Sequence, residues 1–490
     1  MQHERFDPKA PPSAAPDERV QADICIIGAG SAGLSVAAGA AQMGAKVVLI
    51  EKGEMGGDCL NTGCVPSKAL IAAAHAAHAP KTSAQFGVHL GAPRVDFAAV
   101  HAHVHGVIAA IAPHDSVERF EGFGVRVIQE RGAFISKTEV RAGAHVITAR
   151  RFVIATGSGP AAPPIPGLAE AGYLTNETVF DLKEQPEHLV VIGGGPIGVE
   201  MAQAFRRLGS EVTLIERFGI LAKDEPEAVA VVREALIADG VRLMENTGVS
   251  SVARDGAHVR ILIEANGATE TLTASHVLVA AGRKPNLSGL NLEAAGVAYT
   301  AKGVTVDARL RTSNTRVFAI GDAAGGPQFT HIAGYHAGIV IRNALFAMPS
   351  KVDYSALPWV TYADPELAHV GLTEAEARAA GHTPKLLTWR FADNDRAQTE
   401  RRTEGLAKIV LSAKGKILGA TIVGPHAGEL ILTWGLAISS GLGISKVASL
   451  IAPYPTLSEI SKRAAGSHFT PSLFNPRTRA VVRFIQRVLP

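Results

Sequence analysis

The chain has 490 residues, of which 47% are hydrophobic, 19% are charged and 50 are glycine. This length predicts about three domains, and the composition excludes a disordered, collagen-like or small disulfide-rich protein. Lys and Arg number 48 against 45 Asp and Glu, a balance that indicates no nucleic-acid partner. We therefore start from the expectation of small-molecule chemistry.

The N-terminal segment and the cysteine count bear on location. Residues 1–20 carry charges and prolines but no apolar core, so they predict a disordered leader and not a signal peptide. Three cysteines, Cys25, Cys59 and Cys64, are too few for a secreted disulfide framework and indicate a reducing, cytoplasmic setting. The uncharged run 24–45 is long enough to span a membrane, but its glycines and its change from strand to helix pattern argue against a span.

The first recognisable unit is a strand, a glycine-rich turn, a helix and a second strand. An apolar strand over 23–27 leads into the turn GAGSAG at 28–33, which opens a small-residue helix over 34–43. A strand over 46–50 follows and ends at Glu51. This order is a complete βαβ unit.

The same order returns about 165 residues later. A strand over 188–192 leads into GGGPIG at 193–198, a helix over 199–208 and a strand over 211–215 that ends at Glu216. One such turn can serve ordinary close packing, but here the context of strand, helix and distant acid fits twice.

The glycine pattern fits the chemistry of dinucleotide binding. The first glycine makes a tight turn, the second lets the backbone approach a pyrophosphate at the helix N-terminus, and the third packs helix on strand. An acid about 20 residues on can hold a ribose hydroxyl. These roles would fall to Gly28, Gly30, Gly33 and Glu51 in the first unit and to Gly193, Gly195, Gly198 and Glu216 in the second. We expect two bound dinucleotides.

The rest of the chain suggests further units. Segments 153–158 and 277–286 read as short buried strands stopped by glycine, and we expect them where the chain crosses between domains. From Tyr354 the glycine density falls, and segments such as 408–412 and 416–423 predict an antiparallel sheet with helices.

A cysteine pair stands in GGDCLNTGCVPSKAL at 56–70. A zinc half-site and two inert buried cysteines are the alternatives to a redox disulfide, but zinc usually needs four ligands and no second pair exists. Pro66 suits the first turn of a helix, so Cys64 would lie at a helix N-terminus that lowers the pKa of its thiol. Lys68 adds a positive charge one turn on. A redox disulfide between Cys59 and Cys64 fits best.

Together these segments resemble the class I pyridine nucleotide-disulfide oxidoreductases, the flavoprotein family of dihydrolipoamide dehydrogenase, glutathione reductase and mercuric reductase. The resemblance covers about residues 21–470. It rests on the first glycine turn with Glu51, GGDCLNTGCVPSK at 56–68, ATGS at 155–158, GGGPIGVE at 193–200, AGRKPN at 281–286, TSNTRVFAIGD at 312–322 and YPTLSE at 454–459.

The resemblance implies an α/β fold with two Rossmann-like dinucleotide-binding domains, one for FAD and one for NAD(P), and a C-terminal α+β dimerisation domain. The implied boundaries are a leader over 1–20, an FAD-binding domain over 21–162 and 284–352, an NAD(P)-binding domain over 163–283, a dimerisation domain over 353–470 and a basic tail over 471–490. The implied cofactor-binding residues are Gly28, Gly30, Gly33, Glu51, Lys52, Lys68, Thr156, Gly157, Asp322, Gly193, Gly195, Gly198, Glu216 and Gly282. NADH is favoured because a carboxylate at Glu216 would repel a 2′-phosphate, although Arg217 acts in the opposite sense.

The resemblance also assigns catalytic roles. Cys64 would be the thiolate on the flavin side, and Cys59 the outer thiol that attacks substrate. Lys68 and Glu200 would pair beside the flavin. In a homodimer, Tyr454 and Glu459 would complete the partner's active site.

Several positions indicate which member of the family the chain resembles most. The sequence reads PSK after the second cysteine, as dihydrolipoamide dehydrogenases and mercuric reductases do. Tyr454 stands at a position where lipoamide and glutathione enzymes carry a histidine and mercuric reductases carry a tyrosine. Tyr173 matches a second tyrosine that mercuric reductases place near the metal. The chain departs from them in lacking an N-terminal metal-binding domain and a C-terminal cysteine pair.

We therefore expect a mercuric reductase-like enzyme that passes electrons from NAD(P)H to a disulfide, another small molecule or a soft metal ion. Dihydrolipoamide dehydrogenase is the alternative, because Glu459 is kept. A flavin-bound redox-sensing or membrane-recruited interaction protein is the alternative outside the enzyme class.

Two further patterns remain. His101, His103 and His105 alternate on a predicted helix, which favours a solvated face over a metal site, and we expect no structural metal. In the tail, Arg479 and the arginines four and eight residues on oppose an apolar face, which predicts a basic amphipathic helix. Packing on its own domain is the simpler interpretation of this helix, and weak contact with anionic lipid is the alternative.

Overall fold

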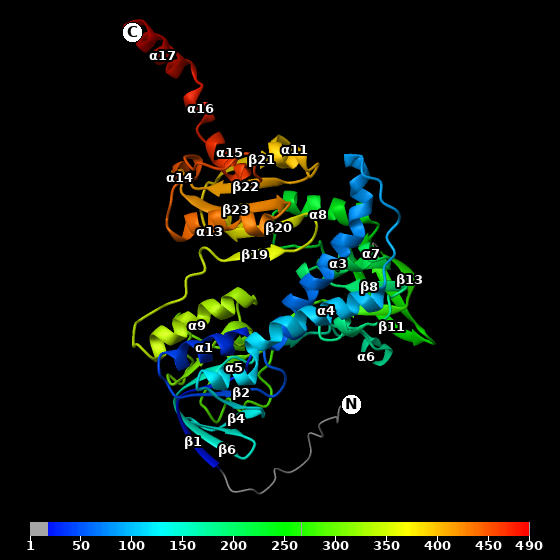
Figure 1. The fold of residues 1–490 in the computed structure, drawn as a ribbon, viewed down its shortest axis with the longest axis vertical. Helices are drawn as coiled ribbons and strands as arrows, with labels where there is room; N and C mark the ends of the chain where they lie inside the picture. Colours follow the sequence, from blue (N-terminus) through cyan, green and yellow to red (C-terminus); the bar gives the residue numbers. More distant parts are fainter. Residues whose placement is uncertain (1–17, 266, 490) are drawn as a thin grey trace.

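The computed structural model describes residues 18–265 and 267–489. Within them the elements form three bodies, each built on a sheet, and a helical extension at the C-terminus (Figure 1). The expected leader lies outside the described residues over 1–17.

The first body contains the N-terminal glycine turn. Its strands are β1 (Glu18–Ile27), β2 (Val47–Ile50), β3 (Arg126–Ile128), β4 (Gly132–Ser136), β5 (Glu139–Ala142), β6 (His145–Ile154), β16 (Tyr299–Thr300), β17 (Gly303–Val304) and β18 (Val317–Ala319). The main sheet runs in the order β3-β2-β1-β6-β5-β4, with β18 beside β6. Strands β1, β2, β3, β6 and β18 are parallel, and Ile24 to Ile27 are buried on both faces, as is typical of parallel strands.

Strand β1 begins earlier than the sequence analysis expected. Glu18 pairs with His145 and Val20 with Ile147, so residues 18–20 belong to the sheet and not to the leader. Val20 and Ala22 are buried while Arg19 and Gln21 are exposed. This alternation over a charged stretch is the period-2 pattern of a half-buried strand.

Some helices of this body cover its sheet, whereas others pack toward the second body. The helices are α1 (Ser31–Gln42), α2 (Gly57–Asn61), α3 (Cys64–Ser83), α4 (Phe97–Ile111), α5 (Val117–Gly122) and α9 (Thr330–Ala344). Helix α3, which begins at Cys64, and helix α4 pack toward α7 (Pro196–Arg207) of the second body. Helices α1 and α9 pack against each other and share an apolar cluster with β1 and β2. The run 24–45 is thus strand, turn and helix, and no helix of the described chain has both the length and the apolarity of a membrane span.

The second body repeats the plan. It contains β8 (His188–Ile192), β9 (Glu211–Ile215), β10 (Arg242–Met244), β11 (Thr247–Asp255), β12 (His258–Ala265), β13 (Ala268–Ala274), β14 (His276–Val279), α6 (Leu168–Ala171), α7 (Pro196–Arg207) and α8 (Pro226–Asp239). A parallel sheet runs β10-β9-β8-β14, with the antiparallel meander β11-β12-β13 on one face and α7 and α8 on the other. Strands β7 (Ser158–Pro160) and β15 (Arg283–Pro285) pair with each other where the chain passes between the first two bodies.

The third body is the expected antiparallel unit. Its strands are β19 (Pro358–Thr361), β20 (Glu366–Gly371), β21 (Lys385–Arg390), β22 (Leu406–Leu411) and β23 (Ile417–Gly424), in the order β19-β20-β23-β22-β21. Its helices are α10 (Glu374–Ala379), α11 (Asp395–Thr399), α12 (Ala427–Leu430), α13 (Leu432–Ser439), α14 (Ile444–Ala448) and α15 (Glu459–Ser467). Trp434 is buried in its core and donates its indole N–H to Ser461 over 3.0 Å. Helices α16 (Thr470–Leu473) and α17 (Pro476–Val488) continue beyond it.

Candidate functional site

A cavity of about 3020 Å³ lies among the three bodies. Both glycine-rich turns line it, and the cysteine pair opens into it. Loops of the third body, including Tyr362, close part of its wall. The fold therefore brings two expected dinucleotide sites and one expected redox centre into a single space.

The first and third glycines of each turn are required by the backbone. Gly28 and Gly193 have φ angles of 107° and 116°, which favour glycine. A Cβ on Gly33 would fall on the carbonyl oxygen of Gly28, and a Cβ on Gly198 would fall on that of Gly193. The helix thus packs tightly on the strand in both units, as expected.

The middle glycines leave open space at the helix N-termini. A Cβ on Gly195 would meet no atom within 4 Å, and one on Gly30 would meet the Cα of Gly57 at 3.9 Å. Helices α1 and α7 begin directly after these glycines, so their free N–H groups face the cavity. This cradle fits the pyrophosphate of a dinucleotide in each unit.

Glu51 and Glu216 each accept a hydrogen bond from the glycine-rich turn of their own unit. Glu51 accepts from the Ala29 N–H over 2.6 Å, and Glu216 accepts from the Gly194 N–H over the same distance. The second oxygen of Glu216 accepts from the Phe218 N–H over 2.9 Å. Both carboxylates also line the cavity, where they can reach a ribose. Arg217 lies beside Phe218, with its guanidinium 5.9 Å from the ring centre.

The remaining expected cofactor residues, Lys52, Thr156, Gly157 and Gly282, line the same cavity. The Thr156 hydroxyl is buried and has no hydrogen-bond partner among the described residues. A buried hydroxyl without a partner is costly, so this atom indicates a polar ligand group beside it. The donor set thus fits the expected cofactor.

The cysteine pair flanks the short turn between α2 and α3, with Cys59 inside α2. Cys64 is the first residue of α3, and both cysteines are free thiols in this structure. The hydrogen bond from Cys59 lowers the pKa of Cys64 most, and the Thr330 hydroxyl and Lys68 lower it further; against burial, the pKa falls to about 6. The same hydrogen bond, together with burial, raises the pKa of Cys59. One thiolate and one thiol are therefore poised at neutral pH.

Lys68 joins α3 to the other two bodies. Its Nζ lies 2.7 Å from a carboxylate oxygen of Glu200 on α7, which is the expected pair. The other oxygen of Glu200 accepts from the Tyr362 N–H over 2.9 Å, and Lys68 Nζ lies 4.3 Å from the centre of the Tyr362 ring. Tyr362 was not among the expected site residues.

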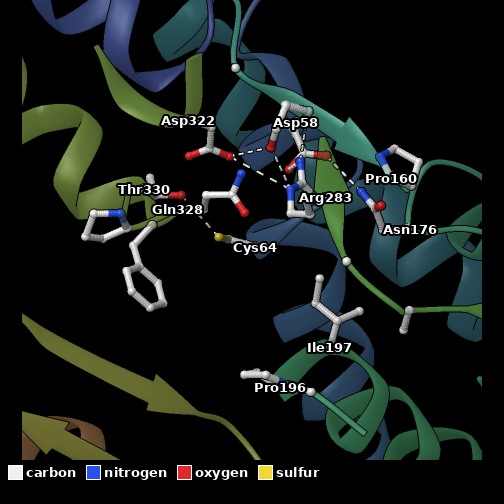
Figure 2. A pocket seen from close by; sticks show the side chains of 18 of the residues that line it. Asp58, Cys64, Pro160, Asn176, Pro196, Ile197, Arg283, Asp322, Gln328 and Thr330 are labelled. Atoms are coloured by element: carbon white, nitrogen blue, oxygen red, sulfur yellow. Dashed lines mark hydrogen bonds and ion pairs between the residues drawn. The ribbon is translucent and has the colours of Figure 1, made fainter. Parts of the chain in front are cut away.

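A polar network beside Cys64 was also missed by sequence reasoning (Figure 2). Arg283 donates to Asp58 over 3.0 Å and to the Ser158 hydroxyl over 2.8 Å, and Ser158 donates to Asp322 over 2.5 Å. Asn176 donates to Asp58 over 2.8 Å. Burial raises the pKa of Asp322 despite Ser158 and Arg283. The signals were present, since Asp58 and Arg283 stand in GGDC and AGRKPN.

Tyr454 and Glu459 do not line the cavity of their own chain. The Tyr454 side chain is exposed and donates to an Asp395 carboxylate oxygen over 3.0 Å, which raises the pKa of the phenol. Glu459 is buried and lies 3.7 Å from Arg463. Each chain therefore presents Tyr454 on its surface, away from its own cysteines.

The expectation for Tyr173 is wrong. Its side chain packs against the apolar cluster of the second body that includes Val190 and Ile261, and it does not line the cavity. The residue lies before β8, and local sequence does not tell on which face of the sheet such a segment packs. Tyr362 is the tyrosine that the fold brings near Cys64 within one chain.

Two of the three histidines of the expected helix lie side by side. His101 and His105 share a face of α4 with ring centres 4.2 Å apart, because residues four apart on a helix are neighbours. His105 contacts the Phe180 carbonyl over 3.1 Å. The described residues contain no group of three or more His, Cys, Asp or Glu side chains placed to hold a metal ion.

Comparison with known proteins gives the family. Residues 22–337 match the model of the pyridine nucleotide-disulphide oxidoreductases, and residues 357–465 match the dimerisation domain of the same family.

Individual relatives agree. The chain is 38% identical over 445 residues to mercuric reductase of Bacillus cereus, covering 90% of this chain and 70% of that protein. It is 37% identical over 458 residues to dihydrolipoyl dehydrogenase of Geobacillus stearothermophilus, covering 92% and 96%. It also resembles the solved Cu(II) complex of the HOCl-induced flavoprotein disulfide reductase RclA of Escherichia coli, with a TM-score of 0.81, 28% identity and coverage of 90% and 98%. The chain belongs to the pyridine nucleotide-disulphide oxidoreductase family, whose members use FAD and NAD(P)H.

Proposed function

We propose that this oxidoreductase transfers electrons from NAD(P)H through the Cys59 and Cys64 pair to a soft metal ion, in the manner of a mercuric reductase. In this assignment the first body holds FAD with Gly28, Gly30, Gly33 and the other residues expected for it, and the second body holds the nicotinamide nucleotide. Bound FAD supplies two-electron transfer between the nicotinamide and the dithiol. The third body joins two chains, so that Tyr454 of each chain serves the other's site.

The observation that carries the proposal is the setting of Tyr454. A dithiol substrate must lose protons to be oxidised, and a group with a pKa near neutrality serves that step well. The Tyr454 phenol has its pKa raised by Asp395, and Glu459 faces Arg463 in place of an imidazole. A phenol with a raised pKa is poorly suited to accept a thiol proton at neutral pH. A metal ion bound by thiolates needs no such proton acceptor during its reduction.

The thiols themselves support a soft metal ion. Thiolate is the sulfur form that binds metals, and soft metals prefer it. Cys64 has a pKa of about 6, so it is deprotonated at neutral pH, and metal binding would displace the proton of Cys59. With Hg(II) the reaction balances as one Hg(II) plus NAD(P)H giving Hg(0), NAD(P)⁺ and one proton, whereas two Cu(II) ions would each take one electron and become Cu(I). The hydride supplies both electrons.

The comparisons support this choice in part. Mercuric reductases are among the relatives with 36% to 38% identity, and a structural relative is known as a Cu(II) complex. Dihydrolipoyl dehydrogenases match at similar identity, and the relative from Geobacillus stearothermophilus is covered over 96% of its length. Oxidation of dihydrolipoamide is therefore the second candidate.

The test is an acceptor panel on the purified holoenzyme. NADH oxidation is followed with Hg(II), Cu(II), glutathione disulfide and quinones, and NAD⁺ reduction is followed with dihydrolipoamide. We expect turnover with Hg(II) or Cu(II) that is lost in Cys59→Ser and in Cys64→Ser. Dihydrolipoamide oxidation as fast as metal-dependent turnover would favour the second candidate.

Cys25→Ala is the matched control for the cysteine variants. Cys25 is fully buried in β1 and does not line the cavity. This variant should retain metal-dependent turnover. If Cys25→Ala loses activity as Cys59→Ser and Cys64→Ser do, the loss would reflect a disturbed structure and not missing thiol chemistry.

A further inference from the structure

The C-terminal helices stand apart from the rest of the molecule. Helices α16 and α17 extend past the third body, and no residue in either helix is buried (Figure 1). The simpler expectation, that this helix packs on its own domain, is therefore wrong for the described chain. The function proposed above gives the segment no task.

The helix is built to form at this place. Asn475 caps α17 by accepting from the Thr478 N–H over 2.9 Å, and Pro476 occupies the first helical position. The Thr478 hydroxyl donates to the Ser472 carbonyl over 3.0 Å, which fixes the turn between the two helices. Yet α17 has 13 residues, and isolated helices of that length are marginal in water. A docking surface would supply the missing stabilisation.

One face of α17 is apolar and exposed. The side chains of Val481, Phe484, Ile485 and Val488 project within about 100° of one another at 100° per residue. Their exposed fractions are 56%, 67%, 43% and 64%. A contiguous apolar face of this kind marks an interaction site.

The opposite face is basic. Arg479, Arg483 and Arg487 follow one another at four-residue spacing on this face, whereas Arg477 adds a fourth positive charge in the first turn, on the side of the apolar residues. The segment after residue 469 contains no Asp or Glu. Removing its four arginines from the formal net charge of +3 leaves the rest of the chain at −1. The extension therefore carries the positive balance of the whole chain.

We propose that α17 binds the surface of an anionic lipid membrane. An apolar face with arginines opposite suits the boundary between acyl chains and headgroups, where the arginine stems can reach lipid phosphates. The helix would lie in the surface, because at about 20 Å it is shorter than the roughly 30 Å core of a bilayer. Pairing with the same helix of a second copy through the apolar faces would leave the arginines of both helices on the outside without an anionic partner, whereas an anionic lipid surface satisfies both faces at once.

Two copies of the helix in a dimer would bind the same membrane jointly. A single amphipathic segment of this size binds weakly, and two on one particle raise the effective affinity without new contacts. The attachment would be reversible and sensitive to salt, because arginines near the surface are screened by ions.

The test uses the full-length holoenzyme and vesicle flotation. Vesicles contain phosphatidylcholine alone or with about 30% phosphatidylglycerol, a composition that supplies anionic surface charge. We expect flotation with the anionic vesicles only, reduced at least tenfold by Phe484→Ser with Val488→Ser and by Arg479→Glu with Arg483→Glu. NADH-dependent turnover, which the variants leave intact, shows that they fold.

A second readout reports insertion. Phe484→Trp should show a blue-shifted emission with anionic vesicles, measured against the unmodified protein to remove the signal of its own tryptophans. The conservative variant with Arg479→Lys and Arg483→Lys should still float.

Several outcomes would overturn the proposal. They are absence of flotation with anionic vesicles, equal flotation with phosphatidylcholine alone, and flotation unchanged in the variants. A dimer that becomes a larger oligomer only when α17 is intact, with no vesicle binding, would assign the helix to a second copy instead.

Discussion

Several neighbouring groups set the pKa of the Cys64 thiol. Its pKa of about 6 results from the Cys59 hydrogen bond, the Thr330 hydroxyl and Lys68 acting against burial. We expect its alkylation by iodoacetamide in the reduced protein to be half-maximal near pH 6, since the thiolate is the reactive form. Lys68→Met should move this midpoint toward the ordinary thiol value of about 8.5. Peptide mapping identifies the alkylated cysteine, and a midpoint unchanged in Lys68→Met would contradict the assigned cause.

The same residue should be visible in the spectrum of the holoenzyme. A thiolate beside the oxidised flavin gives long-wavelength absorption, which we expect on two-electron reduction and in resting Cys59→Ser. The absorption should be absent in Cys64→Ser and should fade as the pH falls through about 6, where the thiolate is protonated. Retention in Cys64→Ser with loss in Cys59→Ser would reverse the two roles.

Glu216 controls the choice between the nicotinamide nucleotides in our interpretation. Its carboxylate is held by two backbone N–H groups at the end of β9, so its charge is fixed at the edge of the site. We expect kcat/KM for NADH to exceed that for NADPH, and Glu216→Gln, which keeps a hydrogen-bond acceptor, to narrow the ratio about tenfold. A tenfold preference of the unmodified enzyme for NADPH would mean that Arg217 faces the ribose.

Tyr454 offers a gain-of-function experiment. An imidazole with a pKa of about 6.5 accepts a thiol proton at neutral pH far better than a phenol does. Tyr454→His should therefore raise dihydrolipoamide oxidation, and acid-base catalysis is typically worth about 10² to 10⁴ in rate. Asp395 and Glu459 remain in place to orient the new ring. Fast dihydrolipoamide oxidation by the unmodified enzyme would show that the phenol is no obstacle.

At the scale of elements, two glycines at the start of α7 have different tasks: Gly198 serves stability and Gly195 serves binding. A Cβ on Gly198 collides with the Gly193 carbonyl, whereas a Cβ on Gly195 enters open space. Gly198→Ala should lower the free energy of unfolding by about 1 to 3 kcal/mol, the usual cost of overpacking. Gly195→Ala should leave stability unchanged and weaken NADH binding, measured by equilibrium titration. Equal loss of stability in both variants would contradict this division.

Sequence patterns predicted the elements well where the signal was local. Strands β8 and β9 have the expected bounds, and α3 begins at Cys64 as the position of Pro66 indicated. The network of Asp58, Asn176 and Arg283 was missed because its members lie more than 100 residues apart. Such contacts depend on how the bodies pack, which no local period reports.

The family resemblance supplied what local patterns could not. The Lys68 and Glu200 pair joins positions 132 residues apart, and it was expected from motif correspondence alone. The same reasoning failed for Tyr173, whose motif match is a single residue. The Lys68 and Glu200 pairing inferred from long motifs therefore agrees with the structure, whereas the placement inferred from a single matching residue does not.

At the scale of the whole molecule, a buried charge cluster joins the second and third bodies. Lys408 on β22 is buried and lies 2.9 Å from Glu225 and 2.8 Å from Glu374. Burial lowers the pKa of Lys408, but its hydrogen bonds to the glutamates raise it overall. The stabilisation is therefore fully present at neutral pH and is lost only when the pH rises through the raised pKa.

Removing the Lys408 ammonium group should lower the free energy of unfolding. Lys408→Met leaves carboxylates without their buried partner, which typically costs about 3 to 5 kcal/mol. Arg378→Met is the matched control, because Arg378 pairs with the same Glu374 while more than half exposed and should cost less than about 1 kcal/mol. Urea unfolding monitored by fluorescence gives both values. Similar costs for the two variants would mean that the cluster does not join the bodies.

The paired turns at Glu51 and Glu216 have a consequence for ligand exchange. Each carboxylate accepts a hydrogen bond from a backbone N–H of the glycine-rich turn beside it, so both turns acquire their shape when the chain folds. An incoming dinucleotide then meets a rigid cradle and loses less affinity to loop ordering. For a coenzyme that arrives and leaves in every turnover, such preorganisation keeps association fast, because no rearrangement of the loop has to precede the encounter.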